Sequence, residues 1–255
     1  MKDNRVRQRV KAGKPVIGCF LGLGSPSVAE MMARAGMDWL VIETEHNALD
    51  SAEIQHMLMA VNGSDAVPIV RVPNRDQVYI QRALDMGAMG ILVPGVRTAD
   101  EARAIVSYTR FPPNGVRSWG PLRASDYTLD SDDYLERADD NILVSLILET
   151  RDAVQNLEEI CEVPGIDVLT IGPWDLSLEL GLDPRQLPLP EIEDISRKAL
   201  EIGRPRGVEI GVSAGTPEGL RERQRQGFTF IQYGPDYNLF VSAVNAGLEA
   251  FDRGE

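Results

Sequence analysis

Polar side chains that could carry acid–base or metal chemistry stand directly after short apolar runs in this chain. The run WLVIE is followed by TEHN, and the run ILVSLILE ends on a glutamate that precedes TRDA. The residues at these run ends are Glu43, Glu45, His46, Arg71, Glu149, Trp174 and Asp175. If the runs are parallel strands of a barrel, their ends lie at one face, where such side chains form a common site.

The histidine count narrows the metal chemistry of such a site. The sequence contains 2 histidines, and His56 falls within an expected helix, which leaves His46 as the candidate for chemistry. A zinc site of three histidines is therefore excluded. Glu149 and Asp175 instead offer a hard oxygen site suited to Mg²⁺ or Mn²⁺, with Co²⁺ as a further option. Such an ion keeps open positions that could hold the carboxylate and keto oxygens of a 2-oxo acid.

Lysine positions argue against Schiff-base chemistry, in which a strand-end lysine attacks a carbonyl. Lys2, Lys11 and Lys14 precede the first expected strand, and Lys198 lies in an expected helix. A carbanion must then be stabilised by a metal and by a cation. Arg71 is the natural cation, since a guanidinium is always charged and can bind an enolate or carboxylate through two donors. This leaves His46 as the acid or base that works at neutral pH.

Each of these residues also has a purely structural interpretation. Asp175 could stabilise the beginning of a helix, and Glu149 could pair with Arg151. Their convergence on one face favours a functional site, because a role in stability would not prefer that face over the other.

The elements that would position these residues alternate along the whole chain. Eight β-rich runs, mostly apolar without interruption, are typical of parallel strands covered on both faces, and they span residues 15–20, 39–43, 68–72, 90–94, 142–149, 167–172, 207–212 and 228–233. Helical patterns lie between them, first after Ser25 and Pro26 and then at residues 51–61, 76–86, 98–108, 151–161, 192–202, 216–226 and 237–251.

This alternation predicts a single (β/α)8 barrel over residues 1–255. A doubly wound open sheet is the alternative, but no GxGxxG motif follows the first strand. Residues 109–140 and 173–191 form longer connections, which in this fold are usually lids or substrate loops.

Composition indicates the kind of partner and compartment. The formal net charge of -13 opposes binding to nucleic acid or an anionic membrane and favours a small ligand. Cys19 and Cys161 provide neither a disulfide framework nor a CxxC motif, which predicts a cytoplasmic protein. The apolar stretch VIGCFLGLG superficially resembles a signal peptide, but it is short and glycine-rich, so we interpret it as a buried strand.

Extended motifs in this order are similar to those of the HpcH/HpaI aldolases, which are metal-dependent class II pyruvate aldolases. The similarity covers GLGSPSVAEMMARAGMDWLVIETEH, PIVRVP, LDMGAMGILVPGVRTADEAR, FPPNGVRSWG, LILETRDAVQNL and VLTIGPWDLSLELG. It is nearly continuous over residues 17–181 and looser after them.

The resemblance implies an aldolase that cleaves a 4-hydroxy-2-oxo acid reversibly into pyruvate and an aldehyde. It implies that Glu149 and Asp175 bind the metal, that His46 is the base, and that Arg71 stabilises the enolate. It also assigns Asp85 to raising the basicity of His46. Asp85, however, ends a helix and should lie at the opposite face of the barrel, so it would need an unusual path or a neighbouring subunit.

The resemblance also implies a homohexamer in which the last helix is exchanged between subunits, and the apolar residues of 239–251 are compatible with that. Packing within one chain would give the same pattern. Alternative functions are a lyase acting on citramalyl or malyl thioesters and an oxo-acid-binding protein without turnover.

Three positions depart from the heptanedioate aldolases of this family. A substrate-binding glutamine is replaced by Ile147, an alanine before the metal aspartate by Trp174, and an aspartate three residues before the histidine by Glu43. Ile147 and Trp174 change the polarity and the room beside the expected oxo acid. We therefore expect the chemistry to be kept and the choice of aldehyde to differ.

Overall fold

The β-strands of the protein close into a barrel. The computed structural model describes residues 1–251, and its eight strands pair in parallel in chain order, with β8 returning to β1. The strands are β1 (Val16–Leu21), β2 (Trp39–Glu43), β3 (Val67–Arg71), β4 (Gly90–Val93), β5 (Leu143–Leu148), β6 (Val168–Ile171), β7 (Glu209–Ser213) and β8 (Phe230–Pro235). The predicted (β/α)8 barrel is confirmed, and the pairing of β1 with β8 excludes an open sheet.

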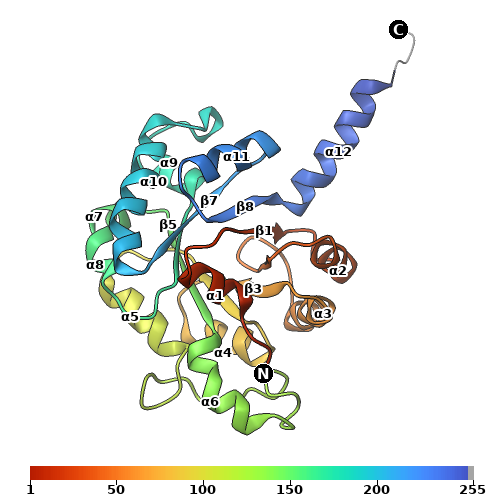
Figure 1. Ribbon diagram of the computed structural model, residues 1–255, viewed down its shortest axis with the longest axis vertical. Coiled ribbons are helices and arrows are strands. Elements are labelled where there is room, and N and C mark those ends of the chain that lie inside the picture. Colours follow the sequence, from red (N-terminus) through yellow and green to blue (C-terminus); the bar gives the residue numbers. More distant parts are fainter. Residues whose placement is uncertain (252–255) are drawn as a thin grey trace.

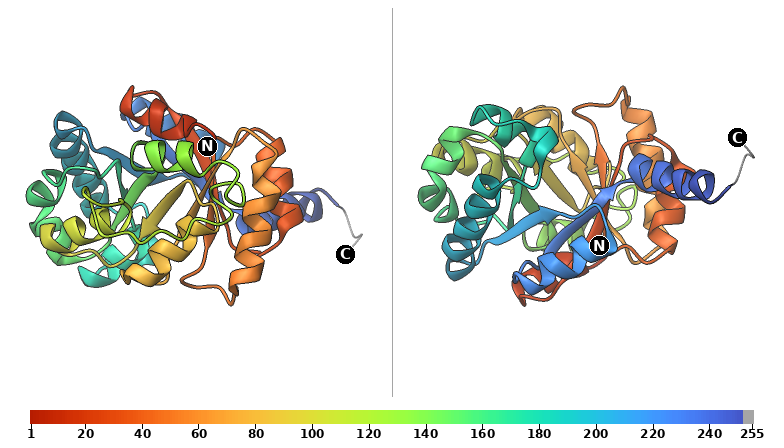
Figure 2. Two further views of the ribbon diagram at one scale, coloured as in Figure 1. Left: turned by 90° about the horizontal axis from the view of Figure 1, so that it is seen from below. Right: turned by 90° about the horizontal axis from the view of Figure 1, so that it is seen from above.

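Helices surround the barrel, as Figures 1 and 2 show. The α-helices are α1 (Arg5–Lys11), α2 (Pro26–Arg34), α3 (Ser51–Asn62), α4 (Gln77–Asp85), α5 (Ala99–Tyr108), α6 (Ser131–Asn141), α7 (Arg151–Gln155), α8 (Leu157–Cys161), α9 (Pro173–Glu179), α10 (Pro190–Gly203), α11 (Pro217–Arg225) and α12 (Asp236–Ala250). Two short 3-10 helices, η1 (Pro184–Gln186) and η2 (Arg204–Arg206), flank α10.

Two helical regions differ from the sequence prediction. The expected connection 109–140 contains most of α6, because one face of this charged segment is buried around Tyr134. The expected helix 151–161 is divided into α7 and α8 at Asn156. The segment SDDYLERADDN has few apolar residues, and a break inside a continuous helical pattern leaves little trace in that pattern, so neither feature is easily predicted.

The interior of the barrel is filled with side chains. The Trp39 ring stacks on Phe230, with 4.4 Å between the ring centroids and 11° between the planes. Gly18 makes room for this pair, since a Cβ there would lie 2.0 Å from the Trp39 ring. A larger apolar layer lies between the strands and the helices. Both faces of the strands are thus covered, as their uninterrupted apolar patterns predict.

Helix α1, which the sequence prediction missed, closes the barrel where the strands begin. Val6 and Val10 join the interior cluster with the first residues of several strands, Val16 among them. Arg7 forms a buried ion pair with Asp167, with 2.9 Å between Nε and Oδ1. The barrel is therefore open to ligands at its other end.

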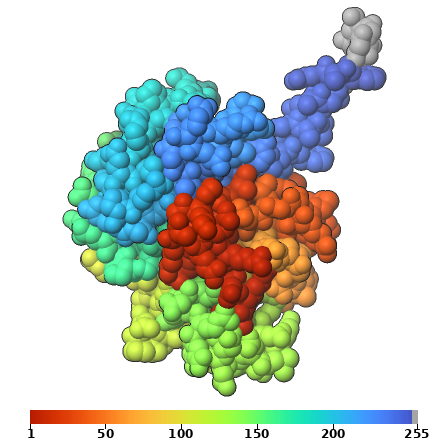
Figure 3. Space-filling view, in the orientation of Figure 1, coloured from red at the N-terminus to blue at the C-terminus, as the bar shows by residue number. Residues whose placement is uncertain are grey.

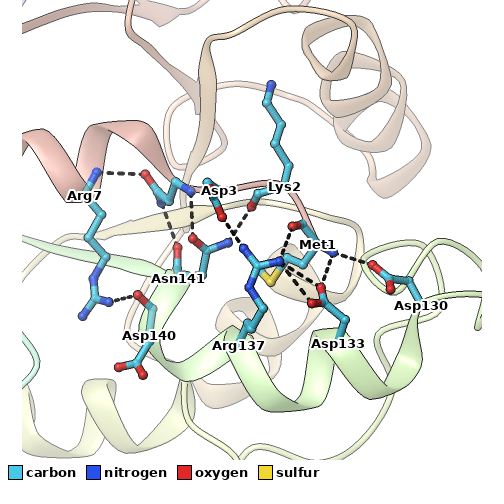
Figure 4. Close-up of polar contacts among 10 residues, drawn as sticks. Met1, Lys2, Asp3, Arg7, Asp130, Asp133, Arg137, Asp140 and Asn141 are labelled. Carbon is cyan, nitrogen blue, oxygen red and sulfur yellow. Dashed lines mark hydrogen bonds and ion pairs between the residues drawn. The ribbon is translucent and has the colours of Figure 1, made fainter.

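Polar contacts fasten the first residues of the chain to α6 (Figure 4). The terminal amine of Met1 contacts Asp133, and its carbonyl accepts a 2.8 Å hydrogen bond from Arg137. Asn141 donates to the carbonyl of Lys2 over 2.6 Å. These contacts hold the residues just before α1 against α6.

Helix α12 extends away from the barrel and stands clear of it in Figures 1 and 3. It carries large exposed apolar side chains, including Phe240, Val241, Val244 and Leu248.

Within residues 1–251, no helix has both the length and the apolar character that a membrane crossing needs.

Candidate active site

A broad cleft of about 1120 Å³ lies at the end of the barrel where the strands finish. The predicted site residues that line it are Glu43, His46, Arg71, Ile147, Glu149, Trp174 and Asp175. Glu45 lines an adjoining hollow together with His46 and Arg71. The structure thus brings together the residues that follow the strand ends and leaves out Asp85.

Arg71 is the central cation of this cleft. It ends β3, and its register partner on β2 is Glu43. One guanidinium nitrogen lies 3.0 Å from Oε2 of Glu43, and another contacts Glu45 and lies 4.0 Å from Oε2 of Glu149. Since its side chain is only 11% exposed, these carboxylates hold the guanidinium in one place.

Glu43 also organises the turn that carries His46. Its Oε1 accepts the backbone N–H groups of Glu45 at 2.7 Å and of His46 at 3.2 Å. One buried carboxylate therefore binds both the cation Arg71 and the backbone of the candidate base.

The carboxylate beside the His46 imidazole within this chain belongs to Glu45. The distance from Nε2 of His46 to Oε2 of Glu45 is 3.5 Å, and the imidazole is 64% exposed to the cleft. Burial raises the pKa of Glu45, while Arg71 and His46 act in the opposite direction. Of the two nearby glutamates, Glu45 faces the imidazole and Glu43 binds the backbone.

Glu149 lies buried directly after β5. The N–H of Gly95 donates to its Oε1 over 2.5 Å. Burial raises the pKa of Glu149, and the nearby charges of Asp175 and Glu45 raise it further, whereas the Gly95 N–H and Arg71 lower it. The site thus disfavours the negative charge on Glu149 unless a further cation is bound there.

Asp175 faces the same region from the first turn of α9. It is exposed, and within residues 1–251 its carboxylate makes no hydrogen bond or ion pair. No group of three or more His, Cys, Asp or Glu side chains with metal-binding geometry occurs in this described part of the chain. Glu149 and Asp175 could hold a metal here as two protein ligands.

Gly172 provides the space that these residues need. A Cβ at this position would lie 2.8 Å from Cβ of Glu149 and 3.0 Å from Cγ2 of Ile147. Ile147 is 5% exposed at the floor of the cleft, and Trp174 is 57% exposed at its rim. Any side chain at position 172 would displace the glutamate.

Asp85 lies at the other face of the barrel. It ends α4, just before β4 begins, and pairs with Arg117 at 2.8 Å. Burial raises the pKa of Asp85, against the opposing effect of Arg117. Within residues 1–251 of this chain, Asp85 makes no contact with His46, so a role beside the imidazole requires a second subunit.

Three groups at the cleft were not singled out by the sequence patterns. Gly95 uses a backbone N–H, which a search for polar side chains overlooks. Asn47 follows His46 directly and donates to the carbonyl of Gly22 over 2.8 Å. Tyr237 reaches the cleft from α12. The position of Asn47 next to the histidine was the available signal.

The fold and the cleft are those of a barrel enzyme with its candidate site at the strand ends. Residues 16–243 match the HpcH/HpaI aldolase/citrate lyase family, and the chain belongs to that family.

Named relatives and a solved structure extend this result. The chain is 37% identical over 237 residues to 2-dehydro-3,6-dideoxy-6-sulfogluconate aldolase of Pseudomonas putida, covering 92% of this chain and 91% of that protein. It is 36% identical over 248 residues to 4-hydroxy-2-oxo-heptane-1,7-dioate aldolase of Escherichia coli, covering 96% and 93%. A HpcH/HpaI aldolase/citrate lyase family protein of Burkholderia cenocepacia J2315 superposes with a TM-score of 0.90 at 34% identity, covering 96% and 98%. The predicted family is confirmed.

Proposed function

We propose that this protein is a metal-dependent aldolase that cleaves a 4-hydroxy-2-oxo acid reversibly into pyruvate and an aldehyde. The observation that carries the proposal is the convergence, at one cleft, of a base, a cation and two carboxylates suited to a metal: His46, Arg71, Glu149 and Asp175. The aldolase relatives described above support the same class of reaction, a carbon–carbon lyase.

The charges of the cleft fit a divalent cation. The carboxylates of Glu43, Glu45 and Glu149 surround Arg71, and the charge of Asp175 lies near enough to Glu149 to raise its pKa. Within residues 1–251, Oε2 of Glu149 makes no hydrogen bond and Asp175 has no partner, so both can bind a hard ion that keeps waters, such as Mg²⁺, Mn²⁺ or Co²⁺. When bound, that ion would supply Lewis-acid stabilisation of the keto oxygen of the 2-oxo acid.

The protein side chains then divide the reaction between them. His46, directly or through a water, removes the proton of the 4-hydroxyl, and the bond between C3 and C4 breaks as the aldehyde forms. The electron pair is left on the pyruvate portion as an enolate, whose oxygen Arg71 stabilises. Backbone N–H groups at the beginning of α9, near Trp174, could bind the pyruvate carboxylate. Proton uptake at C3 completes the formation of pyruvate.

A pyruvate-release assay tests this function. Purified protein is incubated with a series of 4-hydroxy-2-oxo acids, with and without Mg²⁺ or Mn²⁺, and pyruvate is measured with lactate dehydrogenase. Citramalyl and malyl thioesters serve as the parallel series. Cleavage of the thioesters alone would assign the alternative lyase activity, and binding of pyruvate without any turnover would assign a binding protein.

Replacing His46 should separate the base from the metal site. The change His46→Ala is expected to lower kcat for cleavage by about 100- to 10,000-fold, because general-base catalysis typically contributes that much. Binding of Mn²⁺ and pyruvate, measured by titration calorimetry, should be kept. His56→Ala on the exposed face of α3 is the matched control and should resemble wild type. Loss of pyruvate binding in His46→Ala would identify His46 as a ligand instead.

Ile147 and Trp174 should determine the choice of aldehyde. Ile147 cannot form a hydrogen bond, and a buried polar group left unpaired beside it would cost about 1 to 3 kcal/mol. Trp174 adds a large apolar surface at the rim. We therefore expect short or less polar aldehydes to be preferred over succinic semialdehyde.

The comparison of kcat/KM for the two aldehyde classes in wild type and Ile147→Gln checks this expectation. The glutamine should improve the dicarboxylate substrate, whereas the apolar control Ile147→Leu should not. A wild type that already prefers the dicarboxylate, and is not improved by glutamine, would contradict it.

We further propose that the protein is a homo-oligomer, and a hexamer in particular, with α12 exchanged between subunits. The extension of α12 from the barrel and its exposed apolar side chains support this assembly. A neighbouring subunit would also be needed for Asp85 to reach His46. Sedimentation that gives the mass of a monomer would contradict the proposal.

We propose a cytoplasmic location because the two cysteines form no disulfide. Both Cys19 and Cys161 are buried free thiols, which suits a reducing compartment. Cell fractionation with an antibody against the protein tests it, and recovery from a secreted fraction would contradict it.

A further inference from the structure

Asp236 is a buried carboxylate at the junction of β8 and α12. Its Oδ1 accepts the backbone N–H of Gly22 at 2.8 Å and of Tyr237 at 2.8 Å, and its Oδ2 accepts the N–H of Leu23 at 3.2 Å. The residue is 4% exposed and forms no ion pair within residues 1–251. The negative charge is thus balanced by backbone N–H groups, which fix the loop after β1 against the beginning of α12.

Gly22 receives contacts from both sides of this junction. Its carbonyl oxygen accepts the Asn47 Nδ2 hydrogen bond of 2.8 Å. A Cβ at Gly22 would lie 2.6 Å from the Tyr237 ring, so only glycine allows the ring to pack there. The peptide groups of Gly22 therefore connect the carboxylate of Asp236 to the side chain of Asn47.

Asn47 is the residue directly after His46. The turn is held before the histidine by Glu43, which binds the N–H groups of Glu45 and His46, and after it by Asn47. The imidazole itself is largely exposed and has Glu45 as its charged neighbour at 3.5 Å. Its placement over the cleft thus depends on how the backbone is held at these two points.

We propose that Asp236, acting through Gly22 and Asn47, is a positioning residue that fixes His46 over the cleft. This inference rests on the proposed aldolase function, in which His46 removes the proton of the 4-hydroxyl. It means that the conformation at the beginning of α12 sets the position of the base, although α12 itself projects away from the barrel.

A comparison of two reactions that form the same pyruvate enolate can show whether a substitution displaces His46 or only destabilises the protein. Aldol cleavage needs a base for the 4-hydroxyl, whereas decarboxylation of oxaloacetate breaks a carbon–carbon bond to release CO₂ and needs no such proton removal. A displaced His46 should therefore impair cleavage and leave decarboxylation unchanged.

The experiment compares Asn47→Ala and Asp236→Asn with wild type in both reactions. We expect kcat for cleavage to fall about tenfold, the effect of roughly one hydrogen bond, while KM stays within about twofold. The two changes together should be less than additive, because they interrupt the same connection. Asn62→Ala and Asp100→Asn alter exposed residues of the same types and serve as controls.

The outcomes separate this inference from the function on which it rests. Wild type that cleaves no 4-hydroxy-2-oxo acid overturns the function and the positioning role together. If wild type cleaves but Asn47→Ala is unchanged, or loses both reactions in parallel, only the positioning role is overturned. If Asn47→Ala loses cleavage selectively and Asp236→Asn keeps both reactions at the wild-type rates, the role of Asp236 is overturned, because retained decarboxylation shows that this variant is folded.

Discussion

Removal of divalent metal ions is expected to abolish aldol cleavage, and Mg²⁺ or Mn²⁺ should restore it. The reason is that Arg71 is shared among Glu43, Glu45 and Glu149, so its charge alone does not balance the carboxylates and a developing enolate. Pyruvate release is measured after dialysis against a chelator and again after each metal is added back. Full activity after exhaustive removal, or a protein–pyruvate adduct trapped by borohydride, would contradict the metal mechanism.

The variant Glu149→Gln should reproduce the effect of metal removal. It keeps the shape of the side chain but removes the charge that binds the ion. Because burial raises the pKa of Glu149, ionising this carboxyl costs more in the metal-free fold than in the unfolded chain, so above that pKa the glutamine variant should be at least as stable to heat. The affinity of wild type for Mn²⁺ should fall, as the pH is lowered, at a higher pH than an ordinary glutamate would give, because protons compete with the ion for Glu149. Glu159→Gln on the exposed face of α8 is the control.

Replacing Arg71 by alanine should cost about 2 to 4 kcal/mol of transition-state stabilisation, or about 30- to 900-fold in kcat/KM. The charge on the enolate oxygen grows as the bond between C3 and C4 breaks, so most of the loss should appear in kcat. Steady-state kinetics on the best substrate of the pyruvate-release assay measure the division between kcat and KM.

Two further variants define the role of Arg71. Arg71→Lys keeps the positive charge but not the planar pair of donors, and it should recover only part of the activity. Arg34→Ala removes an exposed arginine of α2 and should have no effect. If only KM changes in Arg71→Ala, the prediction is wrong, and Arg71 binds the substrate and the transition state equally strongly.

The strands could be predicted closely because strands buried on both faces appear in the sequence as uninterrupted apolar runs. The run predicted at residues 39–43 is β2, and Arg71 ends β3 as expected. The short helices were harder to predict. Helix α1 has only two apolar residues, Val6 and Val10, on its buried face, and α6 is mostly charged, so both depend on contacts with distant segments rather than on local periodicity.

The candidate site could be predicted as a set of residues but not as a set of contacts. Placement at the strand ends follows from the barrel itself, and this explains why Glu43, Arg71 and Glu149 meet. The sequence does not indicate that Glu43 binds the backbone of His46 while Glu45 faces its imidazole. Those roles depend on the conformation of a four-residue turn, which local residue types leave open.

The closure of the barrel by α1 has a consequence for how the chain folds during synthesis. Arg7 leaves the ribosome early, but its partner Asp167 follows 160 residues later, and β1 must wait for β8 to complete the sheet. Contacts of such long sequence separation slow folding, because loop entropy is lost before they form. The valines of α1 therefore stay exposed to solvent, or to a chaperone, until most of the chain has been translated. We expect α1 to pack against the barrel late in folding.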